Sequence, residues 1–183
     1  MRKVLFSTKE MAVTAVMTAI LCLLGPWAIQ IPISPVPITL GSMGIYLALY
    51  VLGLKKGTIS VVLYVLLGSF GVPVFTNFSG GFGKLLGPTG GYIIGYVFLA
   101  LICGFFLERF PEKLPIHVLG FVLGTLVLYL FGTAWLGFQL KLSFPAALMA
   151  GVIPYIPGDA VKLAFAMFLG SPLRKQCKKS GLL

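Results

Sequence analysis

The sequence has 183 residues, of which 58% are hydrophobic and only 10% are charged. Soluble domains contain about 25% charged residues, and disordered chains are poor in apolar residues, so both classes are excluded. The formal net charge is +10, but long uncharged stretches separate the basic residues. A nucleic-acid surface would need those charges clustered, so the composition indicates a small helical protein of the membrane.

Six membrane-spanning helices in one domain, residues 1–183, would use the whole chain, since a span takes about 20 residues. The first is predicted at 9–29, an apolar stretch too long for a signal-peptide core. Three prolines in 30–37 exclude regular helix there. Further helices are predicted at 38–52, 58–71, 89–107, 116–138 and 144–169. Pro154 and Pro157 are expected to interrupt the last one.

Basic residues are distributed unequally between the two sides of such a bundle. Lys84 and Lys141 fall in odd-numbered loops, and Lys162 falls in the sixth helix. Lys and Arg concentrate on the cytoplasmic side of membrane proteins, so both termini are predicted to be cytoplasmic. The eleven residues on the predicted cytoplasmic side are Arg2, Lys3, Lys9, Lys55, Lys56, Arg109, Lys113, Arg174, Lys175, Lys178 and Lys179.

The predicted outward loops, 31–37 and 75–91, are apolar and rich in Pro and Gly. Irregular backbone of this kind cannot face lipid, because its N–H and C=O groups would lack hydrogen-bond partners. These loops must pack on the bundle or line a cavity. Long loops of compact domains are usually functional, so the outward face is predicted to hold the site.

Asp159 and Lys162 form the strongest candidate site. They are three residues apart, so they share one helix face, and both lie in the last apolar stretch. Ionisable residues at membrane depth are costly and mark functional sites by default. Pro157 next to them would free backbone groups for a ligand, as in transporter sites. The alternative is a structural ion pair that holds this helix to its neighbours.

Two residues of the 75–91 loop are further candidates. The side-chain amide of Asn77 can both donate and accept hydrogen bonds, although Asn is also a common turn residue. Lys84 could attract an anionic ligand or could simply be solvated at the membrane surface. The sequence leaves both questions open.

Catalytic and metal sites are not expected. His117 is the sole histidine, so neither a Ser-His pair nor a histidine metal site can form. The three cysteines are widely spaced, which argues against disulfides and metal ligation. No G-x-x-x-x-G-K-[ST] motif occurs, so the chain has no ATP site of this type. We therefore expect neither an enzyme nor a bound cofactor.

Several motifs resemble the BioY family, the biotin-specific substrate-binding (S) components of energy-coupling factor (ECF) transporters. They cover nearly the whole chain in order: SPVPITL at 34–40, GVPVF at 71–75, SGG at 79–81, LGPTGGY at 86–92 and PGDAVK at 157–162. The resemblance implies an ECF S-component fold with six helices in the cell membrane. It further implies high-affinity biotin binding at the outward face. The partners would be a transmembrane coupling subunit and two ATPase subunits.

The resemblance also assigns roles to residues. Asn77, Asp159 and Lys162 fall where the family binds the ureido head group of biotin. The valerate carboxylate would meet the backbone of Gly90 and Gly91, with Thr89 and Lys84 nearby. Ala15 and Ala19 would dock on the coupling subunit, although small residues on one helix stripe also serve internal packing. By their location in the chain alone, Tyr46, Phe75, Phe78, Tyr92 and Trp135 are candidates to contact the apolar part of biotin.

Two alternatives to a biotin-binding subunit remain open. One is an S component for another vitamin. The other is a small structural or interaction protein of the membrane, in which Asp159 and Lys162 form only an internal ion pair.

Overall fold

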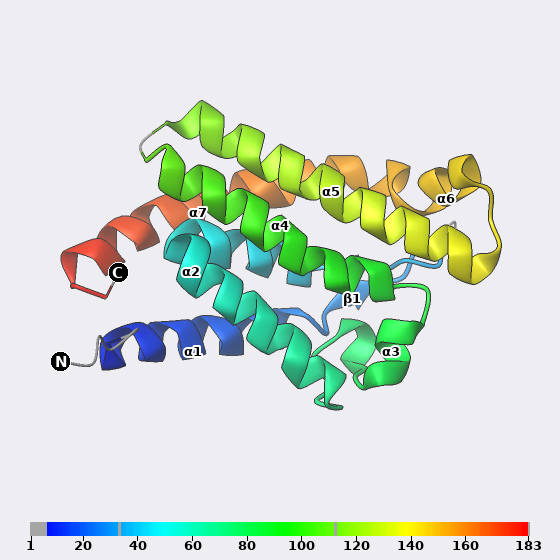
Figure 1. Cartoon of the computed structure of the whole chain (residues 1–183), viewed down its shortest axis with the longest axis horizontal. Coiled ribbons are helices and arrows are strands. Elements are labelled where there is room, and N and C mark those ends of the chain that lie inside the picture. Colours follow the sequence, from blue (N-terminus) through cyan, green and yellow to red (C-terminus); the bar gives the residue numbers. More distant parts are fainter. Residues whose placement is uncertain (1–6, 33, 112, 183) are drawn as a thin grey trace.

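The computed structural model describes residues 7–32, 34–111 and 113–182, which form a helical bundle with one short hairpin (Figure 1). The long helices are α1 (Thr8–Leu24), α2 (Gly41–Ser69), α4 (Gly90–Arg109), α5 (Leu114–Leu140) and α7 (Ile156–Lys179). The shorter elements are strands β1 (Ala28–Ile29) and β2 (Ile38–Thr39), helices α3 (Phe82–Leu86) and α6 (Phe144–Gly151), and the 3₁₀ turns η1 (Thr76–Phe78) and η2 (Ile153–Tyr155).

Helix α1 begins with a capping box and ends earlier than predicted. The Ser7 hydroxyl accepts from the Glu10 amide at 3.2 Å, and the Glu10 carboxylate accepts from the Ser7 amide at 2.8 Å. The predicted helix 9–29 is wrong beyond Leu24, where Gly25 and Pro26 follow. The chain then forms β1, which pairs antiparallel with β2. Residues 38–40 are therefore not helical, contrary to the predicted start at 38.

Helix α2 contains a sharp break at Gly53, whose φ of 77° and ψ of −164° are non-helical. Only glycine adopts this conformation readily. The break separates residues 41–52 from 54–69, which correspond to the predicted helices 38–52 and 58–71. The change of direction packs Gly57 directly against Leu49. The turn predicted between these two helices, at residues 53–57, is thus reduced to Gly53 alone.

Helices α4 and α5 pack closely along their length, because glycines remove side chains from the contact. Gly91 packs against Trp135, and Gly95 packs against Leu128. Helix α4 runs two residues past its predicted end at 107. Helix α5 extends two residues beyond the prediction at each end.

The C-terminal helical stretch is divided by η2 between α6 and α7, at the prolines that were expected to interrupt it. Helix α7 continues to Lys179, ten residues beyond the predicted end at 169, and contains Pro172. Residues 72–88, between the predicted helices 58–71 and 89–107, are also more ordered than expected, since they contain η1 and α3.

Four helical stretches in the described part of the chain are long and apolar enough to cross a membrane: Gly41–Ser69, Gly90–Arg109, Leu114–Leu140 and Phe144–Lys179. The distribution of apolar and polar side chains between the surface and the interior of the bundle also supports a membrane environment. Large apolar side chains such as Leu126 and Phe168 are 55% and 77% exposed, whereas all seven tyrosines are at most 9% exposed. These buried tyrosines are Tyr46, Tyr50, Tyr64, Tyr92, Tyr96, Tyr129 and Tyr155.

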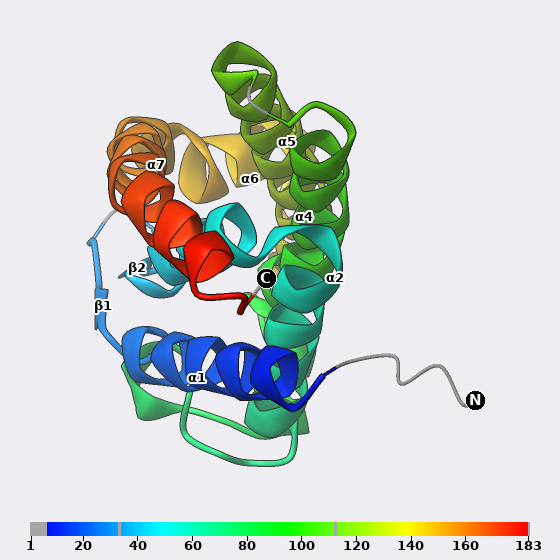
Figure 2. The ribbon, with the colours of Figure 1, turned by 90° about the vertical axis from the view of Figure 1, so that its left-hand side faces the viewer.

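The two ends of the bundle differ. Figures 1 and 2 show that α1 begins, α4 connects to α5, and α7 ends at one end. The ion pair between Lys56 and Glu10, 2.8 Å long, places the turn after Gly53 at this end as well. Helices α3 and α6 and the β1–β2 hairpin lie toward the other end. Of the basic residues used to predict the orientation, Arg2 and Lys3 lie outside the described residues.

Candidate functional site

Asp159 and Lys162 meet in the first turns of α7. The Lys162 ammonium Nζ lies 2.9 Å from Asp159 Oδ1, and each side chain is only 12% exposed. A spacing of three residues places both on one helix face. The pair predicted from the sequence is therefore a buried ion pair.

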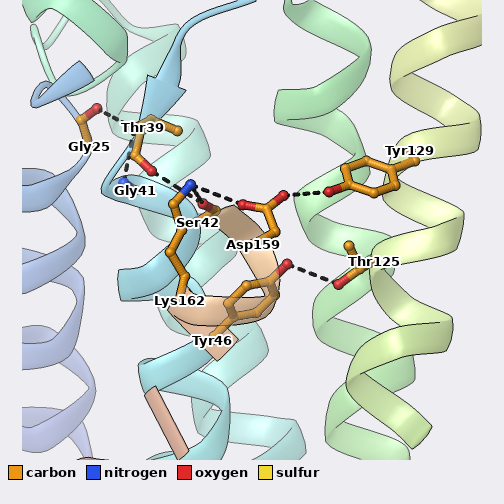
Figure 3. A network of polar contacts seen from close by, with 9 residues as sticks. All are labelled: Gly25, Thr39, Gly41, Ser42, Tyr46, Thr125, Tyr129, Asp159 and Lys162. Carbon is orange, nitrogen blue, oxygen red and sulfur yellow. Dashed lines mark hydrogen bonds and ion pairs between the residues drawn. The ribbon is translucent and has the colours of Figure 1, made fainter. Parts of the chain in front are cut away.

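Two other helices complete this polar cluster (Figure 3). The Tyr129 hydroxyl on α5 donates to Asp159 Oδ2 at 2.6 Å. Lys162 also donates to the Ser42 hydroxyl in the first turn of α2, at 3.1 Å. The Ser42 hydroxyl donates in turn to the Thr39 carbonyl at 3.3 Å. Charged groups removed from water need such hydrogen bonds, and here they also fix both side chains in position.

A cavity lies next to the cluster, with a polar end and an aromatic wall. Asp159, Lys162, Ser42 and Thr39 supply polar groups. The rest of the lining is mostly aromatic and apolar, which is typical of small-molecule sites with a few placed polar groups. It includes Tyr64, Phe75, Tyr92, Ile93, Tyr96, Leu128, Tyr129 and Tyr155, with Val36, Pro37, Thr76, Thr89 and Gly151.

Tyrosine hydroxyls attach this wall to the backbone. Tyr155 donates to the Ser34 hydroxyl at 2.6 Å and contacts the Val36 carbonyl, so it holds the Pro-rich segment against the cavity. Tyr92 donates to the Gly151 carbonyl at 2.9 Å, which connects α4 to the end of α6. Val36 and Pro37 of the Pro-rich segment are buried, as expected for a loop that packs on the bundle.

Five of the residues predicted for the site line this cavity: Phe75, Thr89, Tyr92, Asp159 and Lys162. Tyr46 lies nearby but does not line it. Its side chain is 1% exposed, and its hydroxyl is 2.9 Å from Thr125 Oγ1. Tyr46 instead lines a second cavity between α5 and α7, which Asp159 also lines.

Asn77 and Phe78 lie outside the cavity lining and are exposed. Both have positive φ, 59° and 55°, and the Asn77 amide donates to the Pro26 carbonyl at 2.9 Å. The Phe78 ring packs edge-on against Trp27. Their neighbours Phe75 and Thr76 do line the cavity, so this turn borders the site. The ligand-binding role of Asn77 stays a prediction.

The groups predicted to bind the biotin carboxylate lie near the cavity, but some of them already have contacts within the protein. The Gly90 amide donates to the Gly87 carbonyl at 3.0 Å, and Gly91 packs against Trp135. Trp135 Nε1 also donates to the Gly87 carbonyl, at 2.9 Å, so it anchors the loop. Lys84 on α3 does not line the cavity, and partial burial lowers the pKa of its ammonium below the ordinary value. These carboxylate roles also stay predictions.

Sequence reasoning missed Thr39, Ser42, Tyr96, Tyr129 and Tyr155. A signal existed for Tyr129, because a phenol in an apolar helix needs a hydrogen-bond partner, and Asp159 was available in another apolar stretch. Ser42 gave no such signal, since its contact depends on how α2 approaches α7. Among the described residues, no group of three or more His, Cys, Asp and Glu side chains could hold a metal ion.

Comparison with known proteins identifies the family. The sequence model of the BioY family matches residues 1–179. The chain belongs to the BioY family. The biotin transporter BioY of Thermotoga maritima is 36% identical over 167 residues, which cover 91% of this chain and 96% of that protein. The biotin transporter BioY of Lactococcus lactis is 36% identical over 179 residues, covering 92% of each chain.

A solved structure of a similar protein agrees with this BioY assignment. The crystal structure of the S-component for biotin from an ECF-type ABC transporter matches with a TM-score of 0.82 and 34% sequence identity. The match covers 93% of this chain and 91% of that chain. The fold described above is therefore that of an ECF S component, and the resemblance noted in the sequence motifs is confirmed.

Proposed function

We propose that this chain is the biotin-binding subunit of an ECF-type vitamin importer in the cell membrane. The observation that carries the proposal is a buried Asp159–Lys162 pair that lines a largely aromatic cavity, in a chain 34% identical to an S-component for biotin. The polar end suits a ureido ring, which has two N–H donors and one C=O acceptor. The aromatic wall suits the apolar thiophane ring and the valeryl chain.

Each polar residue then has a defined task. The Asp159 carboxylate has two oxygens with lone pairs left over after Tyr129 and Lys162 have bonded to them, so it can accept from ureido N–H. The Lys162 ammonium has three donors, of which Asp159 and Ser42 receive two. The third can reach the ureido C=O. Charge-assisted bonds of this kind are about twice as strong as neutral ones.

In the proposed orientation the chain crosses the membrane six times, with both termini in the cytoplasm. Eleven basic residues on one side support this direction through the positive-inside rule. The cavity is bordered by the Pro-rich segment, the 75–89 loop and the end of α6, which lie at the opposite end of the bundle. Biotin would thus enter from outside.

Delivery would require the coupling subunit and two ATPase subunits, because this chain has no Walker motif to hydrolyse ATP. Helix α1 offers the docking face. Ala15 and Ala19 are exposed, whereas Thr14, Met17 and Leu21 are buried toward the bundle. Small exposed residues at this spacing let a partner helix approach closely.

Equilibrium binding to the purified chain tests the function directly. Biotin and desthiobiotin, which share the ureido ring, should both bind, and thiamine and riboflavin should not. Binding of a different vitamin in place of biotin would reassign the substrate. Failure of the whole panel, in a folded sample, would favour the structural or interaction role.

A further inference from the structure

A basic groove lies at the end of the bundle where α4 connects to α5 and where α7 ends. It has a volume of about 530 Å³. Tyr50 of α2 and His117 of α5 line it, with Pro111 and Leu114 from the α4–α5 connection and the start of α5. The remaining lining residues are all from α7: Ser171, Arg174, Lys175 and Lys178. None of these residues is acidic.

The α7 residues form one continuous face, because spacings of three, four and seven bring side chains together on a helix. Arg174 is fixed across the groove by a 2.8 Å hydrogen bond to the Tyr50 carbonyl. The ion pairs among the described residues are Lys56–Glu10 and Lys162–Asp159. Arg174, Lys175 and Lys178 thus have no carboxylate within 4.0 Å in that part of the chain.

The groove wall also contains an unsatisfied polar atom. His117 is 7% exposed, and its Nε2 is 2.8 Å from the Phe110 carbonyl. Its Nδ1 is buried and has no hydrogen-bond partner among the described residues. Such unpaired buried atoms are rare in folded proteins.

The second cavity between α5 and α7, described above, lies farther along these two helices and has a volume of about 230 Å³. It is lined by Val122 and Leu126 of α5 and by Ile156, Ala160 and Leu163 of α7, together with Tyr46, Thr125, Tyr129, Val152 and Asp159. Leu126 is nine residues from His117, a distance of about 13 Å along a helix that rises 1.5 Å per residue. The space between α5 and α7, called the seam below, therefore has a basic groove at one end of the bundle and a mostly apolar cavity farther along.

We propose that this seam binds one anionic phospholipid, with its phosphate at Arg174, Lys175 and Lys178 and an acyl chain along Val122, Leu126 and Leu163. The charge and the apolar continuation both match this amphipathic ligand. Guanidinium groups bind phosphate in two-pronged geometry, and basic pockets between spanning helices bind anionic lipid headgroups. The headgroup groove shares no lining residue with the proposed biotin cavity, whereas the acyl-chain cavity shares Tyr129 and Asp159 with it.

Native mass spectrometry of the delipidated chain can measure this binding. The ligands are phosphatidylglycerol, phosphatidylcholine with the same acyl chains, and glycerol 1-phosphate. The test variant is Lys175→Gln with Lys178→Gln, and the matched control is Lys55→Gln with Lys179→Gln. Both variants remove two exposed lysines from the same end of the bundle, but the control pair does not line the groove.

We expect one tightly bound phosphatidylglycerol per chain, with weaker binding of the other two ligands. The test variant should bind it about 30-fold more weakly, and the control should match the unmodified chain. An unfolding temperature equal to that of the unmodified chain would show that the test variant is folded.

Several results would overturn the proposal. Equal losses in both variants would mean general surface attraction. Equal binding of phosphatidylcholine would remove the role of charge, and equal binding of glycerol 1-phosphate would make this a site for soluble phosphate. Loss of coupling-subunit assembly in the test variant, without phosphatidylglycerol binding to the unmodified chain, would assign the groove to an acidic segment of the partner.

Discussion

The Tyr129 hydroxyl and the Asp159 carboxylate join α5 to α7 through a 2.6 Å hydrogen bond. Tyr129 bonds to one oxygen of the carboxylate, and Lys162 bonds to the other. Asp159 is therefore held from two sides at the polar end of the cavity. Binding groups that are fixed in advance lose less entropy when a ligand arrives, so this arrangement should contribute to affinity.

Replacement of Tyr129 by Phe should weaken biotin binding about tenfold. The change keeps the ring but removes a hydrogen bond to a charged group, which typically contributes about 1.5–3 kcal/mol. Isothermal titration calorimetry measures the effect. Tyr50→Phe is the matched control, because Tyr50 lines the groove at the opposite end, and it should leave the affinity unchanged. Equal effects of the two changes would assign the phenol of Tyr129 a role in folding only.

Lys84→Gln tests which group binds the carboxylate of biotin. If the Lys84 ammonium pairs with it, the variant should bind biotin less tightly but should bind neutral biotinamide as the unmodified chain does. Competition binding with the two ligands measures the difference. An identical ratio of the two affinities before and after the change would exclude Lys84 and leave the backbone near Gly91 as the candidate.

Ala15→Leu or Ala19→Leu should separate partner docking from ligand binding. Both alanines are exposed on α1, so a larger side chain would hold a partner helix away without entering the cavity. Co-purification with the coupling subunit and ATP-dependent uptake should fall, while biotin affinity of the isolated chain persists. Ala134→Leu, at an exposed position of α5, is the control. Loss of biotin binding in the α1 variants would place the stripe in the folding core.

Cysteine labelling tests the orientation. Gly83 and Lys55 are exposed positions at opposite ends of the bundle, and added atoms at Gly83 would meet nothing within 4 Å. Gly80 is unsuitable, since a side chain there would collide with the Val72 carbonyl. In a background lacking Cys22, Cys103 and Cys177, an impermeant thiol reagent should label Gly83→Cys on intact cells. Lys55→Cys should label only after lysis. The reverse pattern would invert the proposed direction of transport.

Long apolar stretches made most of the bundle predictable from the sequence, because hydrophobicity and prolines limit where helices can run. The start of α4 and the division at Pro154 follow from these signals. The β1–β2 hairpin did not, since strands of two residues are too short to show alternation. The end of α1 was misjudged because apolar residues continue past Pro26 into the hairpin.

The candidate site could be predicted only where a residue conflicts with its surroundings. Asp159 and Lys162 stand out because charge in an apolar helix needs an explanation. Ser42 and Tyr155 have no such conflict, and their positions depend on contacts between segments about 120 residues apart in the chain, as the Lys162–Ser42 and Tyr155–Ser34 bonds show. The resemblance to the BioY family placed Asn77 in the ligand site, whereas this structure places it beside the cavity.

The most direct test of the account is the biotin affinity of Asp159→Asn, measured by calorimetry on the purified chain. The amide presents one acceptor oxygen where the carboxylate presents two, and Lys162 loses its buried counter-charge. Truncating one partner of a buried charge pair costs about 2–5 kcal/mol in binding, so the affinity should fall at least about 30-fold. An unfolding temperature close to that of the unmodified chain would show that the variant is folded. Unchanged affinity in that folded variant would contradict the site assignment and leave the Asp159–Lys162 pair as a structural contact.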